Sequence, residues 1–65
     1  MSKRMQEWAE KQCEKIAEVN PPGSRCEVLQ VRGPDVLYRL STPDGTWEGW
    51  EHEGESHRDI RWELA

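Results

Sequence analysis

The stretch "VLYRLSTPDGTWEGWEHE", residues 36–53, decides the fold that this chain is predicted to adopt. Its central TPDGT motif combines a proline, which suits the first position of a turn, with a glycine that tolerates a left-handed backbone. Residues 36–41 and 46–53 on either side carry the β-branched and aromatic types that strands favour. We therefore predict an antiparallel β-hairpin whose loop consists of residues 43–45.

The length of this loop sets the register of the hairpin, because three loop residues place the two flanking threonines opposite one another. Side chains alternate between the faces of a sheet, so Tyr38 then lies opposite Trp50 and both face the core. Trp47 projects from the other face, with Arg39 diagonally beside it. The predicted core face comprises Leu29, Val31, Val36, Tyr38, Leu40 and Trp50, and the predicted outer face comprises Val28, Gln30, Leu37, Arg39, Trp47 and Glu51. A slip of one residue would exchange the two faces.

An amphipathic helix is predicted over residues 3–19, before the strands. Its apolar residues recur at helical spacing, and polar residues fill the gaps between them. These apolar residues are Met5, Trp8, Ala9, Cys13, Ile16 and Ala17. Ser2 is a candidate N-cap for this helix. The NPPG motif at residues 20–23 ends it, because a residue that precedes proline avoids the α-helical backbone region.

Two further strands are predicted, one before the hairpin and one after it. Residues 26–32, CEVLQVR, form the first, and residues 60–64, IRWEL, alternate between apolar and charged side chains as a last strand does. The predicted fold class is α+β, with one N-terminal helix packed on a three- to four-stranded antiparallel sheet. The sheet extends from about residue 26 to about residue 64 within one domain, residues 1–65.

The segment VLYRLSTPDGTWEGW, with a tyrosine-bearing strand before an Asp-Gly turn, resembles part of the SH3-like and Tudor-like barrels. The resemblance covers roughly residues 24–51. It implies a small barrel as the alternative fold. It also implies, as the alternative function, a peptide- or RNA-binding module of a larger complex.

The net charge of −4 comes entirely from the last third of the chain. Residues 46–65 contain Arg58 and Arg61 against Glu48, Glu51, Glu53, Glu55, Asp59 and Glu63. Nucleic-acid-binding proteins usually present a basic face, so we expect no direct nucleic-acid partner. No apolar run approaches the roughly 20 residues of a membrane span, and the N-terminal residues lack the apolar region of a signal peptide. We therefore expect a cytoplasmic protein with no membrane partner.

The residues of types that could act in catalysis or bind a metal do not form a catalytic or metal-binding motif in this sequence. The chain has no G-x-S-x-G or phosphate-binding loop, and the soft ligands Cys13, Cys26, His52 and His57 lack a close cysteine spacing. We therefore expect no enzyme activity, metal or cofactor. The two cysteines are expected to be buried free thiols. The alternative is a single disulfide bridge between the helix and the first strand.

The acidic segment and the outward tryptophan together suggest a binding surface. We expect a small non-enzymatic regulator or inhibitor that occupies the surface of a partner protein. The candidate binding residues are Trp47, Arg39, Glu48, Glu51, Glu53 and Glu55. Tryptophan and arginine are typical interface anchors, and the glutamates favour a partner with a basic surface, such as a protein of a nucleic-acid-binding complex. The alternative is that Trp47 closes a second small core with Trp62 or Val28.

In size and acidity the chain is similar to small phage-encoded inhibitors of host machinery, anti-CRISPR proteins among them. This similarity is one of protein class and is carried by no shared motif. It implies a protein that acts by covering the surface of its target, as a monomer or a homodimer.

Overall fold

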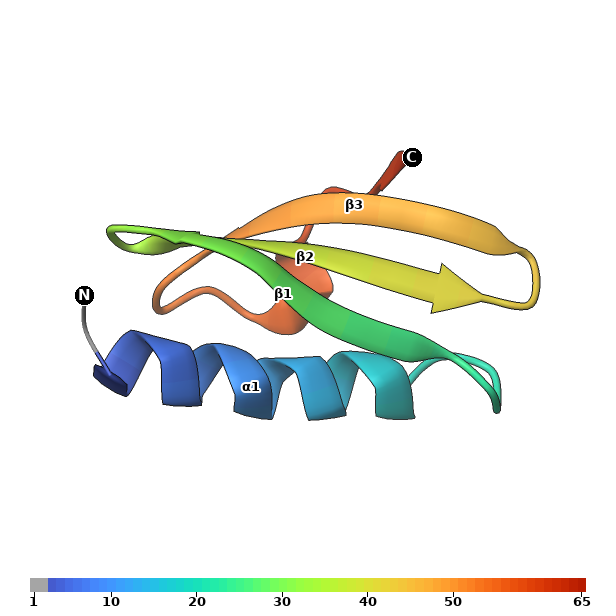
Figure 1. The fold of residues 1–65 in the computed structure, drawn as a ribbon, viewed down its shortest axis with the longest axis horizontal. Coiled ribbons are helices and arrows are strands. Elements are labelled where there is room, and N and C mark those ends of the chain that lie inside the picture. Colours follow the sequence, from blue (N-terminus) through green and yellow to red (C-terminus); the bar gives the residue numbers. More distant parts are fainter. Residues whose placement is uncertain (1–2) are drawn as a thin grey trace.

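The computed structural model describes residues 3–65, in which one helix lies across one face of an antiparallel sheet (Figure 1). Its elements are α1 (Lys3–Glu18), β1 (Arg25–Arg32), β2 (Asp35–Thr42), β3 (Gly45–His52), the 3₁₀ helix η1 (His57–Asp59) and β4 (Glu63–Leu64). The strands follow in the order β1-β2-β3-β4. The predicted α+β class is confirmed, and the barrel alternative is wrong because the sheet is open. Ser2, the candidate N-cap, lies outside the described residues.

Helix α1 buries one face against the sheet. Met5, Ala9, Gln12 and Ile16 are buried, at the spacing of three and four residues that places side chains on one side of a helix. The amide side chain of Asn20 donates a hydrogen bond of 2.6 Å to the carbonyl of Ile16, which satisfies a backbone acceptor that the helix end leaves unpaired. The helix is confirmed and ends one residue before the predicted end. The buried Gln12 was not expected.

The turn between β2 and β3 is one residue shorter than predicted. Thr42 pairs with Gly45, so only Pro43 and Asp44 lie between the strands. The hydroxyl of Thr42 accepts a hydrogen bond from the amide of Asp44 at 3.1 Å and donates one to the carbonyl of Gly45 at 3.2 Å. Gly45, with a φ of +149°, thereby begins β3 instead of completing the loop. Every residue of β3 therefore points to the face opposite to the predicted one.

The core contains three of the six residues predicted for the inner face. Val36, Tyr38 and Leu40 are buried and pack with residues of α1 and with Ile60. Trp50 and Leu29, which the sequence placed in the core, are instead exposed at 42% and 37%. The remaining predicted core residue, Val31, is half-buried against this cluster.

A β-bulge explains why Leu29 leaves the core. The pairing of β1 with β2 shifts between Val28 and Gln30, so Leu29 has no partner residue in β2. A bulge adds one residue to one strand and reverses the alternation of its side chains. Val28 therefore packs against the core, although the predicted register placed it on the outer face. The prediction for Val28 is wrong for this reason.

The C-terminal segment passes over the inner face of β3 at Gly49. A methyl group added at Gly49 would lie 2.6 Å from the Cγ2 atom of Ile60 and 3.0 Å from the backbone carbonyl oxygen of Arg61. The absence of a side chain on Gly49 thus allows residues 60–62 to cross β3 and Ile60 to fill the core. Strand β4 consists only of Glu63–Leu64 and is shorter than the predicted strand over residues 60–64.

Candidate functional site

The two tryptophans of β3 occupy faces opposite to those predicted. Trp47 pairs with the buried Leu40 and is half-buried on the side of the sheet that faces α1. It lines a hollow of about 260 Å³ together with Trp62 and Pro21. The prediction that Trp47 projects outward beside Arg39 is therefore wrong. The alternative was that Trp47 closes a second small core with Trp62 or Val28, and of these two residues Trp62 lines the hollow with Trp47.

Trp50 is the tryptophan that β3 presents on the outer face. It pairs with Leu37, and 42% of its surface is exposed. The guanidinium carbon of Arg32 lies 5.4 Å from the centre of the Trp50 ring, a distance at which a cation is attracted to an aromatic face. Arg32 at the end of β1 thus supports one side of an otherwise accessible indole.

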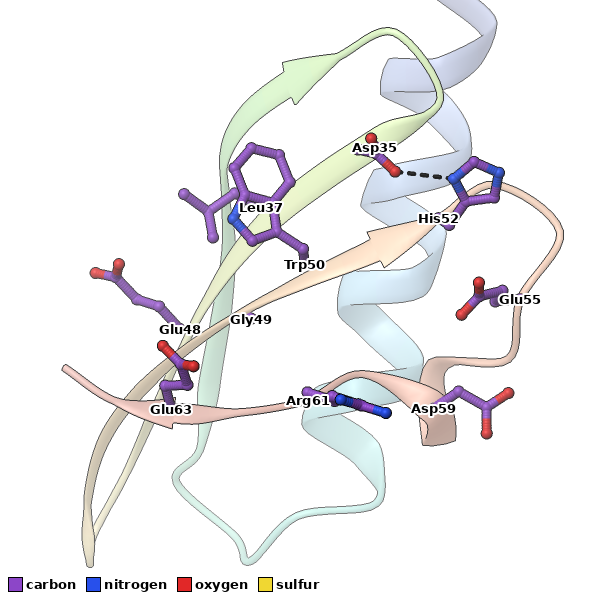
Figure 2. Close-up of a pocket in the computed structure, with 10 residues that line it drawn as sticks. All are labelled: Asp35, Leu37, Glu48, Gly49, Trp50, His52, Glu55, Asp59, Arg61 and Glu63. Atoms are coloured by element: carbon purple, nitrogen blue, oxygen red, sulfur yellow. Dashed lines mark hydrogen bonds and ion pairs between the residues drawn. The ribbon is translucent and has the colours of Figure 1, made fainter.

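A groove of about 460 Å³ runs from Trp50 toward the C-terminal segment (Figure 2). Its lining residues are Asp35, Leu37, Glu48, Gly49, Trp50, His52, Glu55, Asp59, Arg61 and Glu63. Figure 2 shows Trp50 and Leu37 at one side of the groove, and Glu55, Asp59 and Arg61 at the other. Five of the lining residues are carboxylates, whereas Arg61 is the only lysine or arginine among them. The groove therefore combines an apolar patch with a strongly negative wall.

An arginine and a histidine engage two carboxylates of this wall. The carboxylate of Glu48 accepts hydrogen bonds from two nitrogens of Arg39, at 3.1 and 2.8 Å. This pairing raises the pKa of Arg39 above its usual value. Asp35 lies 2.9 Å from Nδ1 of His52 and raises the pKa of that imidazole. Within residues 3–65, no ion pair within 4.0 Å engages Glu55, Asp59 or Glu63.

The structure distributes the predicted binding residues over different surroundings. Arg39 lies on the outer face, as predicted, but its guanidinium is engaged by Glu48. Glu48 and Glu55 line the groove, whereas Glu53 is exposed and does not line it. Whether these residues bind a partner stays a prediction. Glu51, which was expected to belong to the acidic rim, is buried on the inner face.

Glu51 forms a buried polar pair with Tyr38. Only 2% of Glu51 is exposed, and its Oε1 atom accepts a hydrogen bond of 2.7 Å from the hydroxyl of Tyr38. Its Oε2 atom has no hydrogen-bond partner among the described residues. Burial raises the pKa of Glu51, because removing a carboxylate from water disfavours its charged form. The placement in the predicted acidic rim is wrong because the shorter turn moves Glu51 to the inner face.

The raised pKa of Glu51 predicts a pH dependence of stability. Between the usual pKa of 4.5 and the higher folded pKa, the folded chain holds a proton that the unfolded chain has lost. Stability is therefore lost as the pH rises through this window, and ionised Glu51 leaves the protein less stable at higher pH. We expect the stability of Glu51→Gln relative to the wild type to increase as the pH rises from about 4 to about 7. Urea denaturation at both values measures it.

The exposed Glu14→Gln variant is the matched control for this measurement. Because Glu14 is exposed on α1 and is not among the charges that shift the pKa of Glu51, its replacement should change the pH dependence much less than Glu51→Gln does. An equal change in the two variants would contradict the assignment of this pH dependence to the buried carboxylate.

The surroundings of the groove provide no further sign of a known kind of site. No group of three or more metal-binding side chains comes together within residues 3–65. In the same range, no helix has both the length and the apolar character needed to cross a membrane. Comparisons with models of protein families, with curated proteins and with solved structures found no match to this chain. The side chains of the groove are therefore the basis for a functional proposal.

Most of the groove was missed from the sequence, although one signal for Trp50 was present. Glu48 and His52 lie two residues before and after Trp50, so the three share one side of β3. Two polar neighbours on the same side indicate an outward face for the tryptophan between them. The contributions of Arg61 and Glu63 had no comparable signal, because they depend on the path of the C-terminal segment past β3.

Proposed function

We propose that this protein is a small non-enzymatic binding protein whose groove occupies a basic surface of a partner protein. The observation that carries the proposal is the exposed Trp50 at the side of a groove lined by five carboxylates. By covering that surface, the protein would act as a regulator or an inhibitor of its partner. Trp50 takes the role of anchor that the sequence had suggested for Trp47.

The aromatic part of the groove can contribute binding energy to a complex with a partner. Tryptophan is enriched among the residues that dominate protein interfaces, particularly where neighbouring contacts exclude water from it. Trp50 has Leu37 beside it in the sheet and Arg32 against its ring. These contacts limit the orientations of the indole before binding, which lowers the entropy that association would cost.

The charged part of the groove favours a partner with a basic surface. Glu55, Asp59 and Glu63 have no ion pair within residues 3–65, so they remain available to lysine or arginine side chains of another protein. Complementary charge speeds encounter and orients the partner, and the negative wall repels nucleic-acid phosphates. A basic polypeptide therefore fits the groove better than RNA does, which also disfavours the alternative of an RNA-binding module.

We expect Trp50→Ala to weaken binding of a fluorescein-labelled oligo-arginine peptide by about 30-fold, or about 2 kcal/mol, as loss of an interface anchor does. The fold should remain intact because Trp50 is exposed. Fluorescence anisotropy at low ionic strength measures the affinity, and circular dichroism checks the fold.

Val19→Ala is the control, because Val19 follows directly after α1, is 63% exposed and does not line the groove. It should bind the peptide as the wild type does. Equal binding by Trp50→Ala and the wild type would contradict the role of Trp50. Tighter binding of single-stranded RNA than of the peptide would contradict the proposed class of partner.

A further inference from the structure

The two cysteines of the chain meet between the helix and the sheet. Cys13 lies on α1 and Cys26 on β1, thirteen positions apart in sequence. Their sulfur atoms are 3.3 Å apart, and the thiol of Cys26 donates a hydrogen bond to the sulfur of Cys13. They are the only cysteines in the sequence. Two distant parts of the chain thus bring the whole thiol content of the protein to one place.

The position of this pair combines packing with access. Both cysteines are half-buried and pack against the core cluster. Neither residue is fully enclosed by the core, and the contacts of α1 with β1 hold the two side chains together. A disulfide requires the sulfurs to approach to about 2.05 Å, so they need to move together by only a little more than an ångström.

We propose that Cys13 and Cys26 are a modification site, at which a reversible disulfide forms by exchange with a small-molecule disulfide such as oxidised glutathione. The bond joins α1 covalently to β1. The proposal depends on the juxtaposition of the two thiols and is independent of the partner-binding groove.

The exchange proceeds in two balanced steps. The thiolate of Cys13 attacks one sulfur of oxidised glutathione, which forms a mixed disulfide and releases one glutathione thiolate. Cys26 then loses its proton to solvent and attacks the sulfur of Cys13, which releases the second glutathione. The two protein thiols are oxidised by two electrons, and oxidised glutathione is reduced to two thiols. The hydrogen bond from Cys26 lowers the pKa of Cys13 and favours Cys13 as the first nucleophile.

The experiment treats the full reduced chain with oxidised glutathione and maps the products under non-reducing conditions. Trypsin cleavage after lysine and arginine places the two cysteines in the peptides 12–15 and 26–32. We expect one species in which these peptides are linked within a single chain. The disulfide closes the loop between Cys13 and Cys26, which should raise the melting temperature by about 10 °C or more. Dithiothreitol should reverse this shift.

The same exchange in a denaturing concentration of urea tests whether the fold brings the thiols together. The equilibrium constant for bridging should be about 100-fold larger in the folded chain, because the native structure holds the sulfurs in place. Cys13→Ser and Cys26→Ser, each with one thiol, should stop at the mixed disulfide with glutathione and show no rise in melting temperature. An equal constant in urea, a folded chain carrying two glutathiones, or an exclusively intermolecular bridge would each overturn the proposal.

Discussion

Tyr38→Ala is expected to lower the free energy of unfolding of the protein by a large fraction of its total. Tyr38 is completely buried and is the largest of the fully buried side chains. Truncation of a buried aromatic residue costs about 3–5 kcal/mol. A domain of 65 residues has a total stability of about 3–10 kcal/mol, at roughly 0.05–0.15 kcal/mol per residue, so this loss removes a large part of it. Circular dichroism and urea denaturation measure the effect.

Tyr38→Phe separates the contribution of the aromatic ring to stability from that of the hydroxyl group. The variant keeps the packing of the aromatic ring but removes the hydrogen bond of 2.7 Å to Glu51. A buried acceptor left without its donor costs about 1–3 kcal/mol, so Tyr38→Phe should remain folded with reduced stability. The loss should be smaller at low pH, where Glu51 is protonated. Wild-type stability for Tyr38→Ala would contradict the observed packing of β2 against α1.

Gly49→Ala is expected to destabilise the protein by about 1–3 kcal/mol, as overpacking of a filled core does. The added methyl group would lie 2.6 Å from Cγ2 of Ile60 and 3.0 Å from an aromatic carbon of Trp62. Gly49 does not have a positive φ, so the backbone itself accepts alanine. The effect therefore measures the close approach of residues 60–62, and urea denaturation at neutral pH quantifies it.

A double-mutant cycle with Ile60→Ala tests the origin of this loss. Ile60→Ala removes the atom that the new methyl group meets first, so it should cost less in the Gly49→Ala background than in the wild type. The coupling should be at least about 0.5 kcal/mol, which is typical of residues in direct contact. Strictly additive losses would show that Gly49 and Ile60 do not oppose one another and that the C-terminal segment follows another path.

Local sequence signals determined the elements of the fold and their order. The helical spacing of apolar residues and the NPPG motif indicated α1 to within one residue of its observed end. The TPDGT motif correctly indicated a hairpin. These features depend on backbone preferences and on residues close together in the chain, so no knowledge of distant contacts was needed.

The candidate site was only partly accessible from sequence. The concentration of carboxylates in residues 46–65 was visible, and Glu48 and Glu55 of that segment line the groove. The burial of Glu51 and the exposure of Trp50 were not predicted, because both depend on which face of the sheet each residue of β3 points to. Side chains alternate between the two faces along a strand. An error of one residue in the loop length therefore moves every side chain of that strand to the opposite face.

The sequence by itself thus determined that a helix would pack on an antiparallel sheet with an acidic C-terminal third. Only the tertiary structure decided which tryptophan faces solvent. The shorter turn places Gly49 on the inner face opposite Tyr38, where Ile60 fills the space that a side chain would occupy. It also places Leu40 beside Trp47, and Arg39 opposite Glu48. These contacts join residues of different strands and of the C-terminal segment, and together they select one of two registers that turn preferences alone do not separate.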